Sequence, residues 1–178
     1  MSQLIYIASN APLPEVKNPH YQTLSVNEAL SMGLEVDEVF LRQGYNRDEP
    51  NVILWSDTEI IIDTDAGTVD DGGFDDDFAI YQLSAAADDV YTEKKHRAYI
   101  EWSCTAGRAQ RVIDYIGEQL AHTEEIELWN IWMGNEDRPR IRKRTIPIHE
   151  LTPDDVMELE DTDVLSEPPT QYCFVITR

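Results

Sequence analysis

The sequence has no Lys or Arg between residues 48 and 93, although this stretch holds 14 acidic residues. The whole chain of 178 residues has 35 acidic and 14 basic residues, a formal net charge of −21. A field of this sign opposes binding to nucleic acid and to anionic membranes, and it attracts cations. We therefore expect no nucleic-acid or membrane partner and a basic protein as the partner class.

Long apolar runs and cysteine are also scarce. No apolar run approaches the roughly 20 residues that a membrane helix needs, and no basic residue precedes the apolar segment LIYIA at the N-terminus, which argues against a signal peptide. The two cysteines, Cys104 and Cys173, form no CxxC motif. They are typical of reduced core thiols in a cytoplasmic protein, with a disulfide between them as the alternative.

Catalytic signatures are missing as well. The sequence has no GxSxG, HExxH, GxGxxG or P-loop motif, and its four histidines form no pair at metal-ligand spacing. It therefore supplies no catalytic residue and predicts no cofactor, which favours a protein that is not an enzyme.

What the sequence does contain is a clear alternation of elements from residue 96 onward. Segments that alternate or that are β-rich and apolar predict strands. Two amphipathic segments, capped by Thr105 and Thr152, predict helices. Their order is β-α-β-β-α-β, over residues 96–102, 105–122, 125–134, 139–150, 151–160 and 171–178. This order is typical of a ferredoxin-like fold.

The first half is less regular. Residues 3–9 and 77–85 predict strands, and a short helix is expected between a capping Ser25 and a terminating Gly33. We therefore predict one compact α+β domain over 1–178, either a monomer or a homodimer, with a mixed or antiparallel sheet. In this prediction a β-rich part, 1–93, packs on a ferredoxin-like half, 94–178.

Two strands of the second half depart from simple alternation. Residues 125–134 are apolar on both faces, so both faces must be covered, either by the N-terminal part of the chain or by a second subunit. In residues 139–150 the isoleucines fall out of register by one position, which predicts a β-bulge near Arg144.

The densest acidic segment is the loop at residues 63–77. Its aspartates are the candidate partner-binding residues: Asp63, Asp65, Asp70, Asp71, Asp75, Asp76 and Asp77. An EF-hand started at Asp63 has Gly67 at the fifth position and Phe74 at the twelfth, where calcium ligands are needed. Three interpretations stay open: a solvated loop, a looser carboxylate site for Ca²⁺ or Mg²⁺, and a surface for a basic partner.

One basic segment stands out against this charge. RPRIRKR, residues 138–144, holds five of the 14 basic residues. We expect it to neutralise either the acidic loop or the segment 150–167, which has eight acidic residues and no Lys or Arg.

The segments LIYIAS (4–9) and ELWNIWMG (127–134) resemble strands of small, acidic bacterial proteins without an assigned function. This resemblance implies neither an activity nor site residues. The leading hypothesis is a non-catalytic binding module whose acidic surface engages a basic protein, as inhibitors and immunity proteins of nuclease-type toxins do. The alternatives are a divalent-metal-dependent enzyme that uses the loop carboxylates, and a housekeeping protein that binds a small ligand.

Overall fold

The computed structural model describes residues 2–42, 44–49, 53–56, 61–63, 68–70, 74–83, 91–133, 140–160 and 170–178. Contacts divide the chain into two compact units. We call the first, Met1–Lys17 with Asp75–Arg178, the sheet unit, and the second, Asn18–Phe74, the inserted unit. The sequence suggested a division at residue 93 instead. That the whole chain forms one domain stays a prediction.

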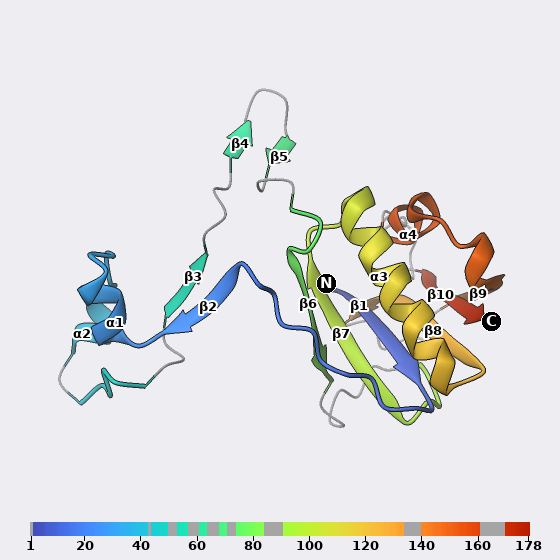
Figure 1. The fold of residues 1–178 in the computed structure, drawn as a ribbon, viewed down its shortest axis with the longest axis horizontal. Coiled ribbons are helices and arrows are strands. Elements are labelled where there is room, and N and C mark those ends of the chain that lie inside the picture. The colour runs from blue at the N-terminus through green and yellow to red at the C-terminus, as the bar shows by residue number, and fades with distance from the viewer. Residues whose placement is uncertain are drawn as a thin grey trace. The chain divides into compact units, whose positions relative to one another are not determined.

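The sheet unit is a mixed α+β structure built on six strands (Figure 1). Their order across the sheet is β6-β7-β1-β8-β10-β9, and every neighbouring pair is antiparallel except β9 with β10. The strands span β1 Ser2–Ser9, β6 Phe78–Gln82, β7 His96–Trp102, β8 Glu125–Met133, β9 Arg140–Pro147 and β10 Thr170–Thr177.

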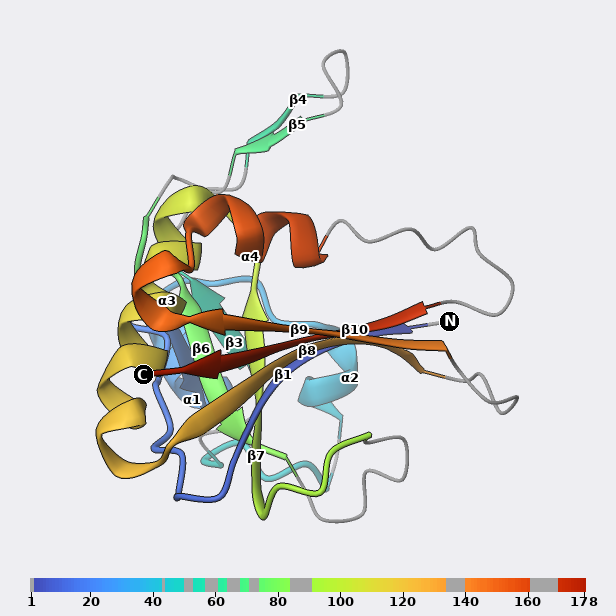
Figure 2. The ribbon, with the colours of Figure 1, turned by 90° about the vertical axis from the view of Figure 1, so that its right-hand side faces the viewer.

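Both helices of this unit begin at the threonines that the sequence predicted. Helix α3, Ala106–Gln119, begins after Thr105, whose hydroxyl accepts a hydrogen bond from the Arg108 N–H. Helix α4, Pro153–Glu160, begins after Thr152, whose hydroxyl accepts from the Asp155 N–H. Figures 1 and 2 show the two helices on the same face of the sheet. Short 3₁₀ turns follow α3 and β9, at Leu120–His122 and Ile148–Glu150.

The ferredoxin-like arrangement is not confirmed, although the order of elements along the chain is as predicted. A ferredoxin-like sheet interleaves its two βαβ units. Here β1 enters between β7 and β8, and β9 lies directly beside β10. The strand order is therefore set by an N-terminal strand that the prediction had placed outside this half.

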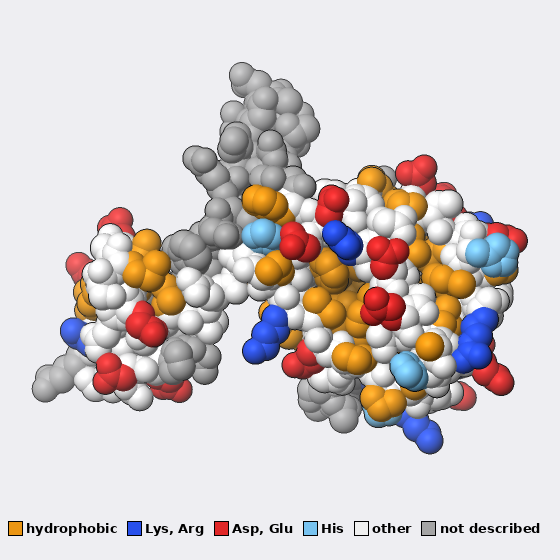
Figure 3. All heavy atoms as spheres, viewed as in Figure 1, with side chains coloured by type: hydrophobic (Ala, Val, Ile, Leu, Met, Phe, Trp, Pro, Cys, Tyr) orange, Lys and Arg blue, Asp and Glu red, His pale blue; other side chains and the backbone are white. Residues whose placement is uncertain are grey.

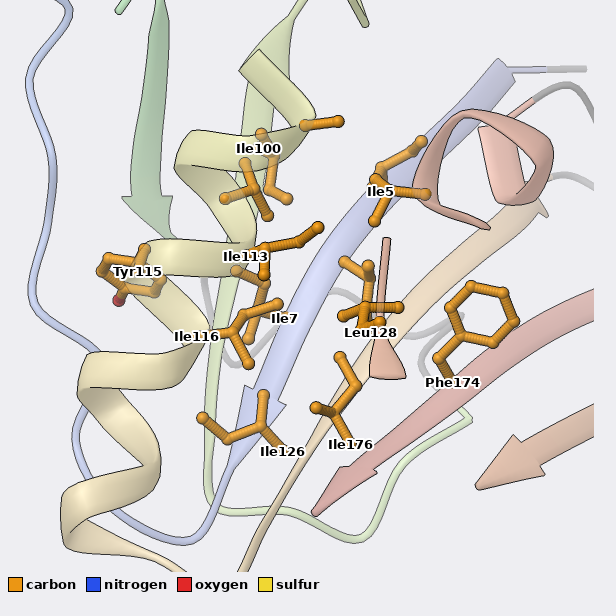
Figure 4. Close-up of a cluster of buried hydrophobic side chains, with 14 of the residues drawn as sticks. Ile5, Ile7, Ile100, Ile113, Tyr115, Ile116, Ile126, Leu128, Phe174 and Ile176 are labelled. Carbon is orange, nitrogen blue, oxygen red and sulfur yellow. The ribbon is translucent and has the colours of Figure 1, made fainter. Parts of the chain in front are cut away.

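The main core lies between the sheet and the two helices. Helix α3 supplies Val112, Ile113 and Ile116, which are buried in one cluster with Ile7 of β1 and Leu128 of β8. Figure 4 shows the side chains of Ile113 and Ile116 directed toward the sheet strands. Burying such side chains contributes roughly 1.5–3 kcal/mol each, so this cluster is the main source of the sheet unit's stability.

The opposite face of the sheet holds a smaller aromatic cluster. Trp129 of β8 is fully buried there and stacks on Tyr6 of β1, with ring centres 5.9 Å apart. Tyr91 lies against the same indole at 6.3 Å. Both faces of β8 are thus covered within the chain, and β1 joins the sheet as its neighbour.

Strand β9 continues without interruption. It pairs with β10 residue for residue from Arg140↔Thr170 to Pro147↔Thr177, so the predicted bulge near Arg144 is wrong. The out-of-register Ile141 is instead an exposed side chain, while Ile146 is buried. The strand needs no bulge because Ile141 points away from the core that Ile146 enters.

The inserted unit consists of short elements. They are β2 Tyr21–Leu24, α1 Val26–Ser31, α2 Glu38–Leu41, β3 Ile53–Ser56, β4 Ile61–Asp63 and β5 Thr68–Asp70. The pairs β2–β3 and β4–β5 are antiparallel. As predicted, Ser25 caps α1, in a capping box with Glu28, and Gly33 follows the helix with a φ of 77°. Among the side chains of this unit that the structure describes, the buried core consists of Leu24, Val26, Ala29 and Val36.

The described part of the chain contains no helix of the length and hydropathy that a membrane span requires.

Candidate functional site

The aspartates of the acidic loop fall into separate parts of the structure. Asp63 ends β4 and Asp70 ends β5, so both belong to a two-stranded hairpin of the inserted unit. Asp65 and Asp71 lie outside the described residues. The last three aspartates belong to the sheet unit, just before β6: Asp75, Asp76 and Asp77.

Asp77 is buried and has a partner inside the protein. Its carboxylate accepts a hydrogen bond from the Arg108 guanidinium, with 3.2 Å between Oδ2 and Nη2. The side chains of Asp77 and Arg108 are 5% and 1% exposed, and Arg108 also donates to the Ser103 carbonyl. A buried ion pair of this kind depends on both partners, because either charge left alone would be costly. Asp77 therefore joins the segment before β6 to the start of α3.

Asp75 lies against the first turn of the same helix. A Cβ atom built at Gly107 would come within 1.7 Å of the Asp75 Oδ1 atom. The glycine thus leaves the room that the carboxylate occupies beside the helix N-terminus, where a negative charge is favourable. Asp75 and Asp77 both contact α3, but only Asp77 is buried, and Asp75 and Asp76 are exposed. The structure therefore gives part of the predicted partner surface an internal role.

Within the described residues, no three or more His, Cys, Asp or Glu side chains are grouped so that they could hold a metal ion. Both cysteines are free thiols, Cys104 partly buried and Cys173 buried. Burial raises the pKa of the Cys173 thiol above its ordinary value.

A groove of about 570 Å³ lies on the sheet unit, beside the edge strand β9. Its walls come from β9, β10 and the last turn of α4, and Figure 2 shows α4 beside these strands. The lining residues are Ile141, Arg142, Lys143, Arg144, Glu158, Leu159, Tyr172, Cys173 and Phe174. This size is within the range of small-ligand sites.

The pairing of β9 with β10 explains why cations and aromatic rings meet in the groove. Arg142 lies opposite Tyr172 and Arg144 opposite Phe174, so each guanidinium reaches the neighbouring ring on the same face. The guanidinium carbons are 6.0 Å from the Tyr172 ring centre and 5.7 Å from the Phe174 ring centre. Arg144 also forms an ion pair with Asp155 of α4, at 3.0 Å.

Lys143 projects to the other face of the sheet, where it meets a buried carboxylate. Its ammonium nitrogen is 3.1 Å from a Glu127 oxygen and 4.7 Å from the centre of the Trp129 ring. Glu127 also accepts hydrogen bonds from the Thr92 hydroxyl and the Trp129 indole. Burial acts to raise the pKa of Glu127, but these three donors and the Lys143 charge outweigh it, and the pKa lies below its ordinary value.

The comparisons with known proteins identify no relative. No model of a protein family, no curated protein and no solved structure matches the chain.

The basic segment 138–144 is visible in the sequence, but the groove that it lines is not. Its expected role in neutralising the segment 150–167 agrees with one contact, the ion pair between Arg144 and Asp155. The aromatic partners were missed because they lie on β10, about 30 residues further along the chain. The only local signal was the shared period of two, with Arg142 and Arg144 on one strand and Tyr172 and Phe174 on another.

Proposed function

We propose that the protein is a non-catalytic binding module whose inserted unit, Asn18–Phe74, engages a basic protein. The proposed binding surface is thus the whole inserted unit rather than the acidic loop at residues 63–77 alone. Of the candidate partner-binding residues, Asp63, Asp65, Asp70 and Asp71 belong to this unit.

One observation carries the proposal: negative charge and exposed apolar side chains occur together in the inserted unit. It holds 12 acidic residues and two arginines, a net charge of −10. Among the described residues of the whole chain, seven large hydrophobic side chains are exposed, and five of them are in this unit: Leu30, Met32, Val39, Tyr45 and Phe74. Figure 3 shows hydrophobic and acidic side chains interspersed over α1 and α2. Exposed apolar groups amid polar ones are typical of protein-binding surfaces.

The hydrogen bonding of the sheet unit is continuous across the point of insertion, which supports a separate role for the inserted unit. Val16 and Ile80 form an antiparallel bridge, with N–O distances of 3.0 and 2.9 Å between their main chains. The Gln82 N–H donates to the Glu15 carboxylate at 3.1 Å. The sheet is therefore complete without the inserted unit, whose acidic and apolar groups are not needed to form it.

The proposal can be tested by capturing proteins from a lysate of the source cell. The test variant changes Asp63, Asp65, Asp70 and Asp71 to Asn. The control removes the same charge from exposed acids of the sheet unit: Glu101, Asp114, Glu118 and Glu124, changed to Gln or Asn. We expect a basic protein to be retained by wild type and control and lost by the test variant, and the retention to weaken at high salt.

Equal loss in both variants would show that only the net charge matters. Equal retention in both would place the binding surface elsewhere. Either result contradicts the proposal. A further variant, Met32→Ser with Val39→Ser, keeps the charge and should weaken binding through the apolar part of the surface.

A further inference from the structure

We propose that the groove between β9 and α4 binds a small organic anion: a carboxylate or phosphate group carried on an apolar body that contains a ring. This site goes beyond the proposed function, because it lies on the sheet unit and has the opposite charge to the inserted unit.

Three arginines of β9 lie on one face of the strand. Positions 140, 142, 144 and 146 share one face of β9, since side chains alternate along a strand. Ile146 is buried in the main core, but the other three positions on this face hold arginines and are exposed. This face of β9 is therefore buried in the core near its C-terminal end, at Ile146, and carries exposed guanidinium groups along the rest of the strand.

Arg142 is available to a ligand. Among the described residues no carboxylate lies within ion-pair distance of its guanidinium, in a chain where acidic residues outnumber basic ones 35 to 14. Its guanidinium carbon lies over Tyr172. A guanidinium held over a ring still presents N–H donors along its edge, in the geometry that pairs with two oxygens of a carboxylate or phosphate. Arg142 is therefore positioned to bind the anionic group.

The remaining walls of the groove are mostly apolar. Leu159, Tyr172 and Phe174 line the groove with apolar side chains, and the hydrocarbon body of the ligand would lie against them. Among the residues that the structure describes, Glu158 is the only acidic one that lines the groove. Its charge disfavours an anion on the α4 side and directs the anionic group of the ligand toward the arginines of β9.

The net charge of the protein favours a small anion over a polyanion as the ligand. A charge of −21 repels polyanions such as nucleic acid at long range. At an ionic strength of about 0.15 M the Debye length is about 8 Å, so a ligand with one or two charges experiences chiefly the nearby arginines. We therefore expect a small molecule in the groove.

The test uses the full chain and calorimetric titration with three probes: phenyl phosphate, benzoate and inorganic phosphate. Phenyl phosphate, benzoate or both should bind wild type, and the tighter of the two identifies the anionic group. Inorganic phosphate should bind more weakly than phenyl phosphate, because it has no apolar body. Arg142→Gln should weaken binding by about tenfold or more. The control, Arg111→Gln, removes an exposed charge from α3 and should leave binding unchanged.

Three results would overturn the proposal. One is that neither ring-bearing probe binds wild type. Another is that Arg142→Gln and Arg111→Gln weaken binding equally, since the effect would then be one of net charge. The third is equal affinity for phenyl phosphate and inorganic phosphate. Arg142 is exposed, and a matching thermal melt of each variant will confirm that both are folded.

A fourth variant addresses competition by the chain itself. Residues 160–167 contain four acidic residues and precede β10. Changing Asp161, Asp163 and Glu167 to Asn or Gln should leave the affinity for the ring-bearing probes unchanged. Binding that appears only in this variant would show that the groove serves the protein's own acidic segment, and the proposal would fail.

Discussion

Two buried carboxylates show how single residues of a strongly acidic chain can stabilise it. Asp77 is paired with Arg108, and Glu127 is held by Lys143 and two further hydrogen-bond donors. Hydrogen bonds to a charged group contribute about 1.5–3 kcal/mol each, more than a surface ion pair does. A few well-placed cations therefore offset part of the repulsion that a net charge of −21 creates.

The Glu127 site predicts a particular dependence of stability on pH. Because the pKa of Glu127 is lowered in the folded state, its ionised form stabilises the fold. This contribution is complete above the ordinary pKa of 4.5 and is lost as the pH falls through the lower folded value. Glu127→Gln should therefore cost about 1–3 kcal/mol at neutral pH, and the difference from wild type should shrink below pH 4.5.

Urea unfolding over a series of pH values measures this difference. Glu118→Gln, an exposed carboxylate on α3, serves as the control and should follow wild type throughout. If Glu127→Gln lowers the free energy of unfolding by the same amount from neutral to acid pH, the stabilising role of the ionised Glu127 carboxylate is contradicted.

At the scale of elements, the start of α3 illustrates how a loop and a helix constrain each other. The Thr105 cap and the Arg108 guanidinium belong to the helix, while Asp75 and Asp77 reach it from the segment before β6. Gly107 is the residue that makes this contact compatible with the helix. Glycine within a helix costs roughly 0.5–1 kcal/mol relative to alanine, so its presence needs a reason, and the Asp75 carboxylate supplies one.

A double-mutant cycle tests whether the Asp75 carboxylate explains the glycine at position 107. In an Asp75→Ala background, Gly107→Ala should stabilise the protein by about 0.5–1 kcal/mol, the usual effect of alanine in a helix. In wild type the new methyl group must displace the Asp75 carboxylate from the helix N-terminus, so the gain should be smaller by about 0.3–1 kcal/mol. Thermal melts of the four proteins give this coupling energy. A coupling near zero would mean that Asp75 does not occupy this place.

At the scale of the whole molecule, the sheet unit depends on one N-terminal strand. β1 pairs with β7 on one side and with β8 on the other, so it lies inside the sheet. Without it, β7 and β8 would each lose a hydrogen-bonded neighbour, and part of both cores would be exposed. The inserted unit, in contrast, leaves and re-enters the sheet unit beside the Val16–Ile80 bridge.

Two truncations follow from this difference. Residues 94–178 expressed alone should aggregate or lack cooperative unfolding, because β1 is missing from the middle of the sheet. A chain in which a short Gly/Ser linker replaces 18–74 should stay soluble and unfold cooperatively, since the sheet unit keeps all six strands. Size-exclusion chromatography and thermal melts distinguish the two. A soluble, cooperatively unfolding 94–178 fragment, or an aggregated linker variant, would contradict this account of the sheet.

The sequence by itself determined the local elements and the acidity. The threonine and serine caps placed the starts of α1, α3 and α4, because capping depends on residues within one turn of each other. Alternation identified β7 as a strand, and the continuous apolar run at 172–176 identified β10 as a buried one; both are signals within a few neighbouring residues. The absence of Lys and Arg from residues 48–93 also needed no structure to be seen.

The tertiary structure decided which elements became neighbours. Alternation shows which face of a strand is apolar, but it does not show which strand will pair with it. Only the fold could bring β1 between β7 and β8, place Tyr172 and Phe174 beside the arginines of β9, and turn Asp75 and Asp77 toward α3. Each of these contacts joins segments far apart in the chain. They form because this arrangement of the whole sheet buries more apolar surface and satisfies more hydrogen bonds than other pairings of the same strands. Neither quantity can be read from a local sequence pattern.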